Sequence, residues 1–82
     1  MAENTVGIVG IIVKDRQASI ELHAVLHKNS DIIVGRQGIP FRDRDLSLIS
    51  IAVEGPADRI ASMVSDISAI QNISAQSVIA GD

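Results

Sequence analysis

The chain of 82 residues has the length of a single domain, which we assign to residues 1–82. A domain of this size buries only roughly 60% of the surface that its unfolded chain exposes. Seven Lys and Arg against ten Asp and Glu give a net charge of −3, which argues against electrostatic binding to nucleic-acid phosphates. Phe41 is the single aromatic residue, which argues against binding through stacked bases. No cysteine is present, which excludes disulfides, thiolate catalysis and cysteine-ligated zinc or iron–sulfur centres.

The N-terminal segment argues against export and membrane insertion. It carries an acid where a signal peptide would carry basic residues, and its apolar run, residues 6–13, is too short to span a bilayer. We therefore expect a soluble, cytoplasmic protein that does not associate with membranes.

The first part of the chain predicts a strand and then an amphipathic helix. Residues 6–13 are apolar at almost every position and rich in β-branched side chains, as in a strand buried on both faces. Asp15 can cap the helix that follows, which we place at residues 18–29. Its apolar face is formed by Ala18, Leu22, Val25 and Leu26. The other side carries Ile20, His23, Ala24 and His27.

The middle of the chain predicts a hairpin with a charged tip. Residues 32–39 are predicted to form an edge strand, because Gly35 and Gly38 interrupt the segment and Pro40 closes it. A charged connection follows and leads into a strand at residues 46–54 that is apolar on much of both faces. One face of that strand holds Ile49, Ile51 and Val53, and the other holds Leu46, Leu48, Ser50 and Ala52.

The last part of the chain predicts a second helix and a final strand. Pro56 suits the first turn of a helix, and an apolar stripe at helical spacing follows it, formed by Ile60, Met63, Val64, Ile67 and Ile70. The helix breaks at residues 71–72, and residues 73–80 alternate loosely with Ser and Gln, as an edge strand does. The tail, residues 81–82, is expected to fray.

Together these elements predict an α+β fold with the order βαββαβ. That order is typical of the ferredoxin-like two-layer sandwich, in which an antiparallel sheet of order 4-1-3-2 carries two helices on one face. The strands at 6–13 and 46–54 would be central. Because the helices cover only one face, we expect a second copy of the chain to cover the other, with Leu46, Leu48 and Ala52 in the oligomer interface. The predicted assembly is a dimer, and pairs of dimers would give a tetramer.

Two histidines on the first predicted helix are candidate metal ligands. His23 and His27 are four residues apart, so both could reach one zinc or nickel ion. No acidic residue stands at helical spacing from both, and two histidines on an exposed helical face are the simpler interpretation. We therefore predict no metal and no other cofactor, with ligands from a second subunit as the alternative.

Several residues around the hairpin are candidates for ligand binding or for contact with another chain. Arg36 near the tip, with Arg42 and Arg44 beyond it, could clamp a carboxylate, although a solvated loop of mixed charge has the same pattern. Gly38 and Pro40 could bring the backbone close to a ligand, or could simply shape an edge strand.

A further candidate lies at the turn before the first helix. Asp15 could orient a ligand amine, although an aspartate before a helix is usually a cap. The candidate ligand or interface set is thus Asp15, Arg36, Gly38 and Pro40. The serines have no paired base in the sequence, so no catalytic residue is predicted.

The stretch from Leu26 to Gly55 resembles a known family. Leu26-His27, then SDIIVGRQGIPF at 30–41, LSLIS at 46–50 and VEG at 53–55 look like the small family named as regulators of an iron-only hydrogenase system. These are ACT-like domains that are also similar to the ligand-binding half of nickel-responsive repressors. The resemblance covers nearly the whole chain. It implies a regulatory domain with no catalytic residues to carry over.

The chain departs from that family at two places and from amino-acid-binding ACT domains at a third. Gln37 stands where the family usually has Met, and SDIS at 65–68 stands where it has Gly-Lys-Leu-Gly. ACT domains that bind amino acids have an Asp followed by a glycine-bearing loop after the first strand. This chain has Asp15 there, without the glycine.

The resemblance and the residues together favour a non-enzymatic regulatory module that acts through self-association and a small ligand or protein partner. Two alternatives are a metal-ion sensor that uses His23 and His27 and a small enzyme with its site at a subunit interface. The sheet offers no paired acid and base for the enzyme. We expect no direct binding to DNA, because no predicted helix carries three or four Lys or Arg on one face.

Overall fold

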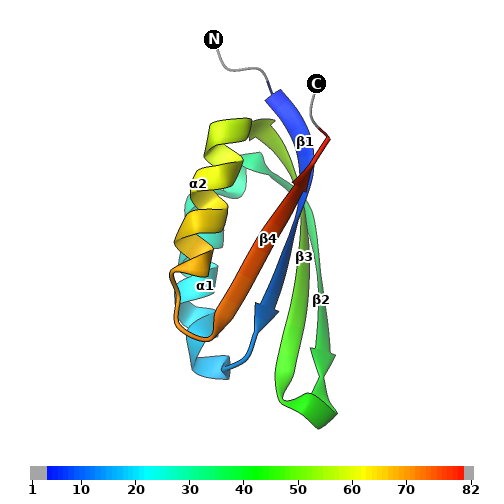
Figure 1. Cartoon of the computed structure of the whole chain (residues 1–82), viewed down its shortest axis with the longest axis vertical. Helices are drawn as coiled ribbons and strands as arrows, with labels where there is room; N and C mark the ends of the chain where they lie inside the picture. Colours follow the sequence, from blue (N-terminus) through cyan, green and yellow to red (C-terminus); the bar gives the residue numbers. More distant parts are fainter. Residues whose placement is uncertain (1–3, 81–82) are drawn as a thin grey trace.

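The computed structural model describes residues 4–80 and shows a sheet with both helices on one side of it (Figure 1). In chain order the elements are β1 (Asn4–Val13), α1 (Ser19–Lys28), β2 (Ile33–Phe41), β3 (Leu46–Pro56), α2 (Ala57–Ser68) and β4 (Ile73–Ile79). The predicted α+β class and element order are confirmed. The tail at 81–82 lies outside the described residues. Within 4–80, neither helix has the length and hydropathy to cross a membrane.

The sheet is antiparallel, and its strands lie in the order β2-β3-β1-β4. Counted from the other edge, this order is the 4-1-3-2 expected from the sequence, and it is compatible with a ferredoxin-like fold. The strands β1 and β3 are central, and β2 and β4 form the edges. An edge suits β2, because Pro40 has no N–H to donate to a neighbouring strand.

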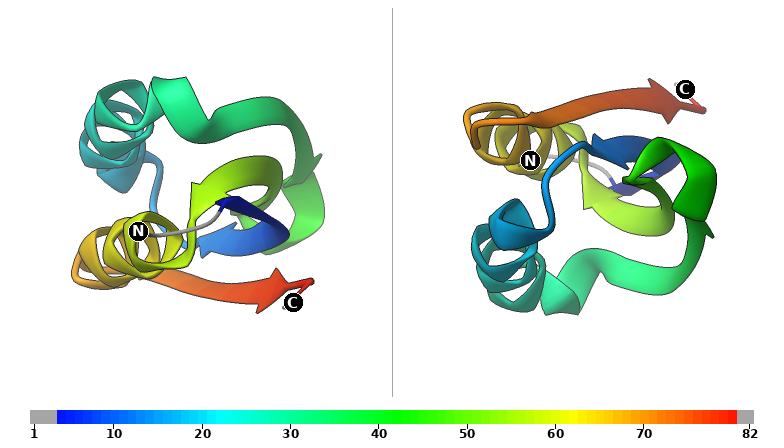
Figure 2. Two further views of the ribbon diagram at one scale, coloured as in Figure 1. Left: turned by 90° about the horizontal axis from the view of Figure 1, so that it is seen from above. Right: turned by 90° about the horizontal axis from the view of Figure 1, so that it is seen from below.

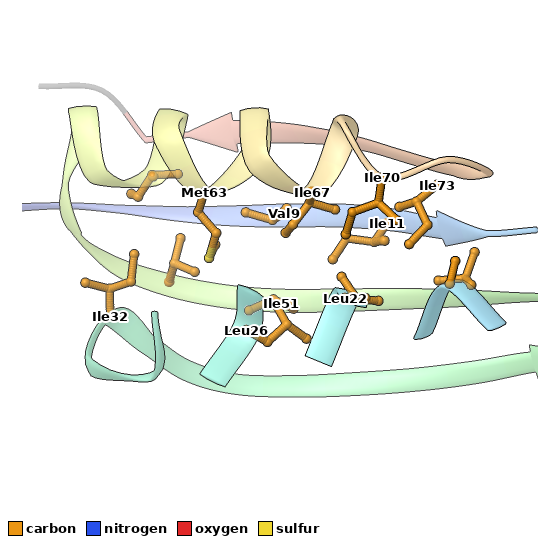
Figure 3. Packing of buried hydrophobic residues seen from close by; sticks show 14 residues of the cluster. Val9, Ile11, Leu22, Leu26, Ile32, Ile51, Met63, Ile67, Ile70 and Ile73 are labelled. Atoms are coloured by element: carbon orange, nitrogen blue, oxygen red, sulfur yellow. The ribbon is translucent and has the colours of Figure 1, made fainter. Parts of the chain in front are cut away.

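An aliphatic core fills the space between the helices and the sheet (Figure 3). The two predicted helical stripes point into it and meet alternate residues of the central strands. The fully buried large side chains are Val9, Ile11, Leu22, Ile51, Val53, Ile60, Met63 and Ile67. Each of these side chains contributes about 1.5–3 kcal/mol through burial, which makes this layer the main source of stability.

Within the single chain the first strand is buried on one face only, as expected when both helices cover the same side of the sheet. Val9 and Ile11 are fully buried, whereas Val6 and Ile8 are 55% and 54% exposed in the single chain. The reason is visible from the ends of the molecule, where α1 and α2 lie on the same side of the sheet (Figure 2). The second face of β1 therefore has no cover from its own chain.

At two of the boundaries that differ from the sequence prediction, a short 3-10 turn replaces the expected start of an element. Residues 16–18 form such a turn, capped by Asp15, whose Oδ1 accepts a hydrogen bond of 3.0 Å from the backbone N–H of Gln17. The helix α1 therefore begins at Ser19. Ile32 is buried in a second turn, and β2 begins one residue later and continues through Pro40.

An ion pair joins the turn that follows α1 to the start of α2. The Arg59 guanidinium donates to both carboxylate oxygens of Asp31, at 2.9 and 3.0 Å, and to Oδ1 of Asn29 at 3.3 Å. The buried Asn29 in turn donates from Nδ2 to the carbonyl of Val25. The hydrogen bond from Arg59 holds the pKa of Asp31 below its ordinary value.

Candidate functional site

The sheet surface opposite the helices carries a continuous aliphatic patch, which we call the open face. Ile8 at its centre pairs with Ala52 on β3 and with Val78 on β4, and paired residues of neighbouring strands point to the same side. By the same register, Ile12 lies beside Leu48. The patch is formed by Val6, Ile8, Ile12, Ile39, Leu48, Ala52 and Val78.

The open face is both solvent-exposed and nearly free of charge. Five of its large residues have exposed fractions from 37% at Ile12 to 75% at Val78, and Leu48 is half-buried. Alternation along the described strands places no Lys or Arg on this side, and Glu54, near one end of β3, is its single charged residue. Two such faces can therefore meet without burying a positive charge.

A shallow hollow of about 400 Å³ lies in the open face above Gly10. Ile12, Leu48, Ser50 and Gln76 line its sides. A Cβ placed on Gly10 would meet nothing closer than the carbonyl oxygen of Gln76 at 4.0 Å, so the fold itself leaves this space unfilled. The hollow has the size to accept side chains from another molecule.

The three predicted interface residues occupy alternate positions of β3 and so share one side of the strand. Leu48 and Ala52 are on the open face, and Leu46, the first residue of β3, also lines a pocket near α1. The sequence reasoning did not name Ile39 and Val78 as interface residues. Their signal was the strand register, since each edge strand places alternate residues beside the central ones.

A second region of interest lies between α1 and β2, where two pockets adjoin. The first, of about 420 Å³, lies between the start of α1 and the hairpin, with Arg16 and Arg42 on its two sides. The second, of about 470 Å³, lies farther along α1 and is lined by His27 and Arg36. His23 lines both pockets. We call the two together the α1–β2 groove.

The candidate residues on β2 face this groove. Arg36 lies within β2, inside the strand predicted at 32–39, and pairs with Ile51 of β3. Alternation puts Gly38 and Pro40 on the same side of the strand. The Nη2 atom of Arg36 lies 3.3 Å from Nε2 of His23. Because an arginine can only donate, Nε2 is the accepting atom of this contact and Nδ1 is left to carry the ring proton.

Of the remaining candidates, the two histidines lie at this groove and Asp15 lies at the turn before α1. Asp15 caps the turn before α1, which agrees with the simpler of its two interpretations. His23 and His27 lie on the same side of α1, facing the groove. The described part of the chain contains no group of three or more His, Cys, Asp or Glu that could hold a metal ion. The neighbour of His23 is the cationic Arg36.

The sequence reasoning missed the contribution of the turn before α1. Arg16 and Ser19 line the first pocket together with His23, and His27 continues the same line along the helix. Their spacing of three and four residues was a usable signal. What the sequence alone did not show was that this line faces β2.

Comparison with known proteins supports the resemblance seen in the sequence. The TM1266-like family, described as "Iron-only hydrogenase system regulator, putative", matches residues 5–77. Among solved structures, the uncharacterized protein TM1266 from Thermotoga maritima is similar, with a TM-score of 0.92 and 25% sequence identity. The match covers 96% of this chain and 100% of that one. A search of curated proteins finds no match.

Proposed function

Because the chain belongs to the TM1266-like family, whose description is that of a regulator of an iron-only hydrogenase system, we propose that it is a non-enzymatic regulatory domain that works as a self-associated assembly. The observation that supports this proposal is the exposed aliphatic face opposite the helices. Exposed apolar patches of this kind usually mark a contact with another molecule.

A second copy of this chain is the occupant that we propose for the open face. The sheet has four strands spaced by roughly 4.8 Å, and β1 and β4 pair over seven residues. The area of the open face is therefore on the order of 400–500 Å². Two copies would bury roughly twice that area, close to the lower limit of a specific interface. A two-fold dimer also places the same uncharged patch on both sides, which suits a face without Lys or Arg.

The proposed regulator acts through a small ligand or a protein partner and not through DNA. A net charge of −3 gives no electrostatic support for binding phosphates. The metal-sensor alternative gains no third ligand from the described residues, and a guanidinium at 3.3 Å from His23 opposes a metal cation there. A pair of dimers would retain the same primary interface.

A genetic experiment tests the regulatory role. Deletion of the gene in the organism that encodes it should change the level or activity of the iron-only hydrogenase, measured as transcript and as hydrogen evolution. Wild-type protein and Ile20→Glu, which alters an exposed residue of α1, should restore the original level. Ile8→Glu, which places a charge on the open face, should not. Unchanged hydrogenase output after deletion, or full rescue by Ile8→Glu, would contradict the proposal.

A further inference from the structure

The α1–β2 groove is lined by an excess of positive charge on an acidic chain. Arg16, Arg36 and Arg42 line its two pockets, against Asp45 as the acidic residue. Within residues 4–80 the only ion pair joins Arg59 to Asp31, so none of the three groove arginines has a carboxylate within 4.0 Å. The net charge of the whole chain is −3, so this concentration of guanidinium groups is a local feature.

The cationic groups lie at two places along the groove, and the Arg36 guanidinium is at the junction of the two pockets, where its Nη2 lies 3.3 Å from Nε2 of His23. Arg16 and Arg42 flank one pocket, and Arg36 lies in the other. At roughly 3.3 Å per strand residue, the backbone from Arg36 to the end of β2 spans roughly 16 Å. Long, flexible arginine side chains can make the distance between their guanidinium groups shorter than this. Gly38 lies between Arg36 and Pro40 on β2, and a Cβ there would meet nothing within 4 Å.

Both pockets also have aliphatic surface. Val13, Ile49 and Phe41 line the first, and Leu26 and Ile33 line the second. Each has a volume within the range of roughly 300–1,000 Å³ that is usual for small-molecule sites. Apolar walls with a few polar groups at defined places are the usual composition of such sites.

His23 lies at the junction of the two pockets, in contact with Arg36. Its Nε2 accepts from Arg36, which leaves the Nδ1 proton without a protein acceptor in the described chain. A bound molecule that passes from one pocket to the other would pass this imidazole. The N–H group is then available to donate to an oxygen of the ligand.

We propose that the α1–β2 groove binds an elongated small molecule with an acidic group at each end and an apolar middle. One acidic group would lie between Arg16 and Arg42, where planar guanidinium groups match a carboxylate, and the other would lie at Arg36. The inference rests on the proposed function only in treating this molecule as the regulatory signal. Binding and self-association are measured separately, so either can fail alone.

A titration followed by ¹H–¹⁵N NMR tests the proposal on the whole chain. The probes are azelate, a nine-carbon dicarboxylate, and its four-carbon relative succinate, with acetate and inorganic phosphate as single-anion controls. Azelate should bind more tightly than the other three. Its amide shifts should be confined to the start of α1, to β2 and to the hairpin turn.

Arginine substitutions give the second arm of the test. Arg16→Gln, Arg36→Gln and Arg42→Gln should each weaken azelate binding by about tenfold or more, because each removes a charge-assisted hydrogen bond. Arg44→Gln is the matched control, since Arg44 lies in the same turn as Arg42 but lines neither pocket. It should change the affinity by less than about twofold. The NMR spectra also show whether each variant is folded.

Three results would overturn the proposal. If acetate or phosphate bound as tightly as azelate, the groove would be a simple anion site that does not recognise a second acidic group. Shifts scattered over the surface, or no shifts at millimolar azelate, would mean no site in the groove. Equal weakening by Arg44→Gln and Arg42→Gln would mean that the general charge of the hairpin is responsible and not the pocket.

Discussion

The substitution Ile8→Glu tests the open face at its centre. Ile8 pairs with Ala52 and Val78, and slightly more than half of the residue's surface, 54%, is exposed in the single chain. Full burial of an isoleucine contributes about 1.5–3 kcal/mol, so covering the exposed half contributes about 1 kcal/mol per copy. A two-fold dimer therefore loses about 2 kcal/mol of apolar burial when both copies are changed.

The introduced charge adds a larger loss. Each glutamate would lie in an aliphatic interface without a cation from its own open face, and burying an unpaired ion costs several kcal/mol. Together these effects should raise the dissociation constant of the dimer by a factor of about a thousand or more. The folded chain itself should tolerate the change, because position 8 faces solvent when the chain is alone.

Sedimentation equilibrium at micromolar concentration measures this effect. Wild-type protein should have a multiple of the 8.7 kDa chain mass, and Ile8→Glu should have the mass of one chain. Ile20→Glu is the matched control, since Ile20 is an even more exposed isoleucine, at 77%, and lies on α1. It should retain the wild-type mass. An unchanged mass for Ile8→Glu, or equal dissociation by Ile20→Glu, would refute the reasoning.

Two further predictions concern stability. Gly55→Ala should lower the free energy of unfolding by about 1–3 kcal/mol, because its Cβ would stand 2.8 Å from Cγ2 of Ile32, whereas Gly38→Ala should stay within about 0.5 kcal/mol in the same urea titration. Equal effects of the two would contradict this. The lowered pKa of Asp31 stabilises the fold above its unfolded pKa, and this contribution is lost as pH falls below about 4. Asp31→Asn, which weakens the contact with Arg59, should therefore show a smaller loss of stability between pH 7 and pH 3 than wild type, and an identical loss would count against it.

Local patterns in the sequence were sufficient to predict the fold. The stripe on α2 and the alternation in β3 specify their elements, because helical and extended periodicities are distinct. The 3-10 turn at residues 16–18 was not predicted, since its capping aspartate and its apolar Ala18 equally suit the first turn of an α-helix. The one-sided burial of β1 depends on where both helices lie, and the continuous apolar run of that strand does not show it.

The candidate sites were less accessible from the sequence. The groove depends on the approach of α1 to β2, which brings His23 next to Arg36, thirteen residues away in the chain. No periodicity within either element encodes that distance. The open face was found in part, through Leu48 and Ala52, because the central strands are apolar on both sides. The edge-strand residues depend on the register between strands, which only the folded sheet shows.

Isotope-filtered NMR on a mixture of labelled and unlabelled chains tests the central claim most directly, because it detects contacts between methyl groups of different copies. Self-association through the open face predicts intermolecular contacts from the methyl groups of Ile8, Ile12, Leu48 and Val78, and none from Ile20 on α1. The absence of intermolecular contacts, or contacts made by Ile20 in place of the sheet residues, would contradict the account.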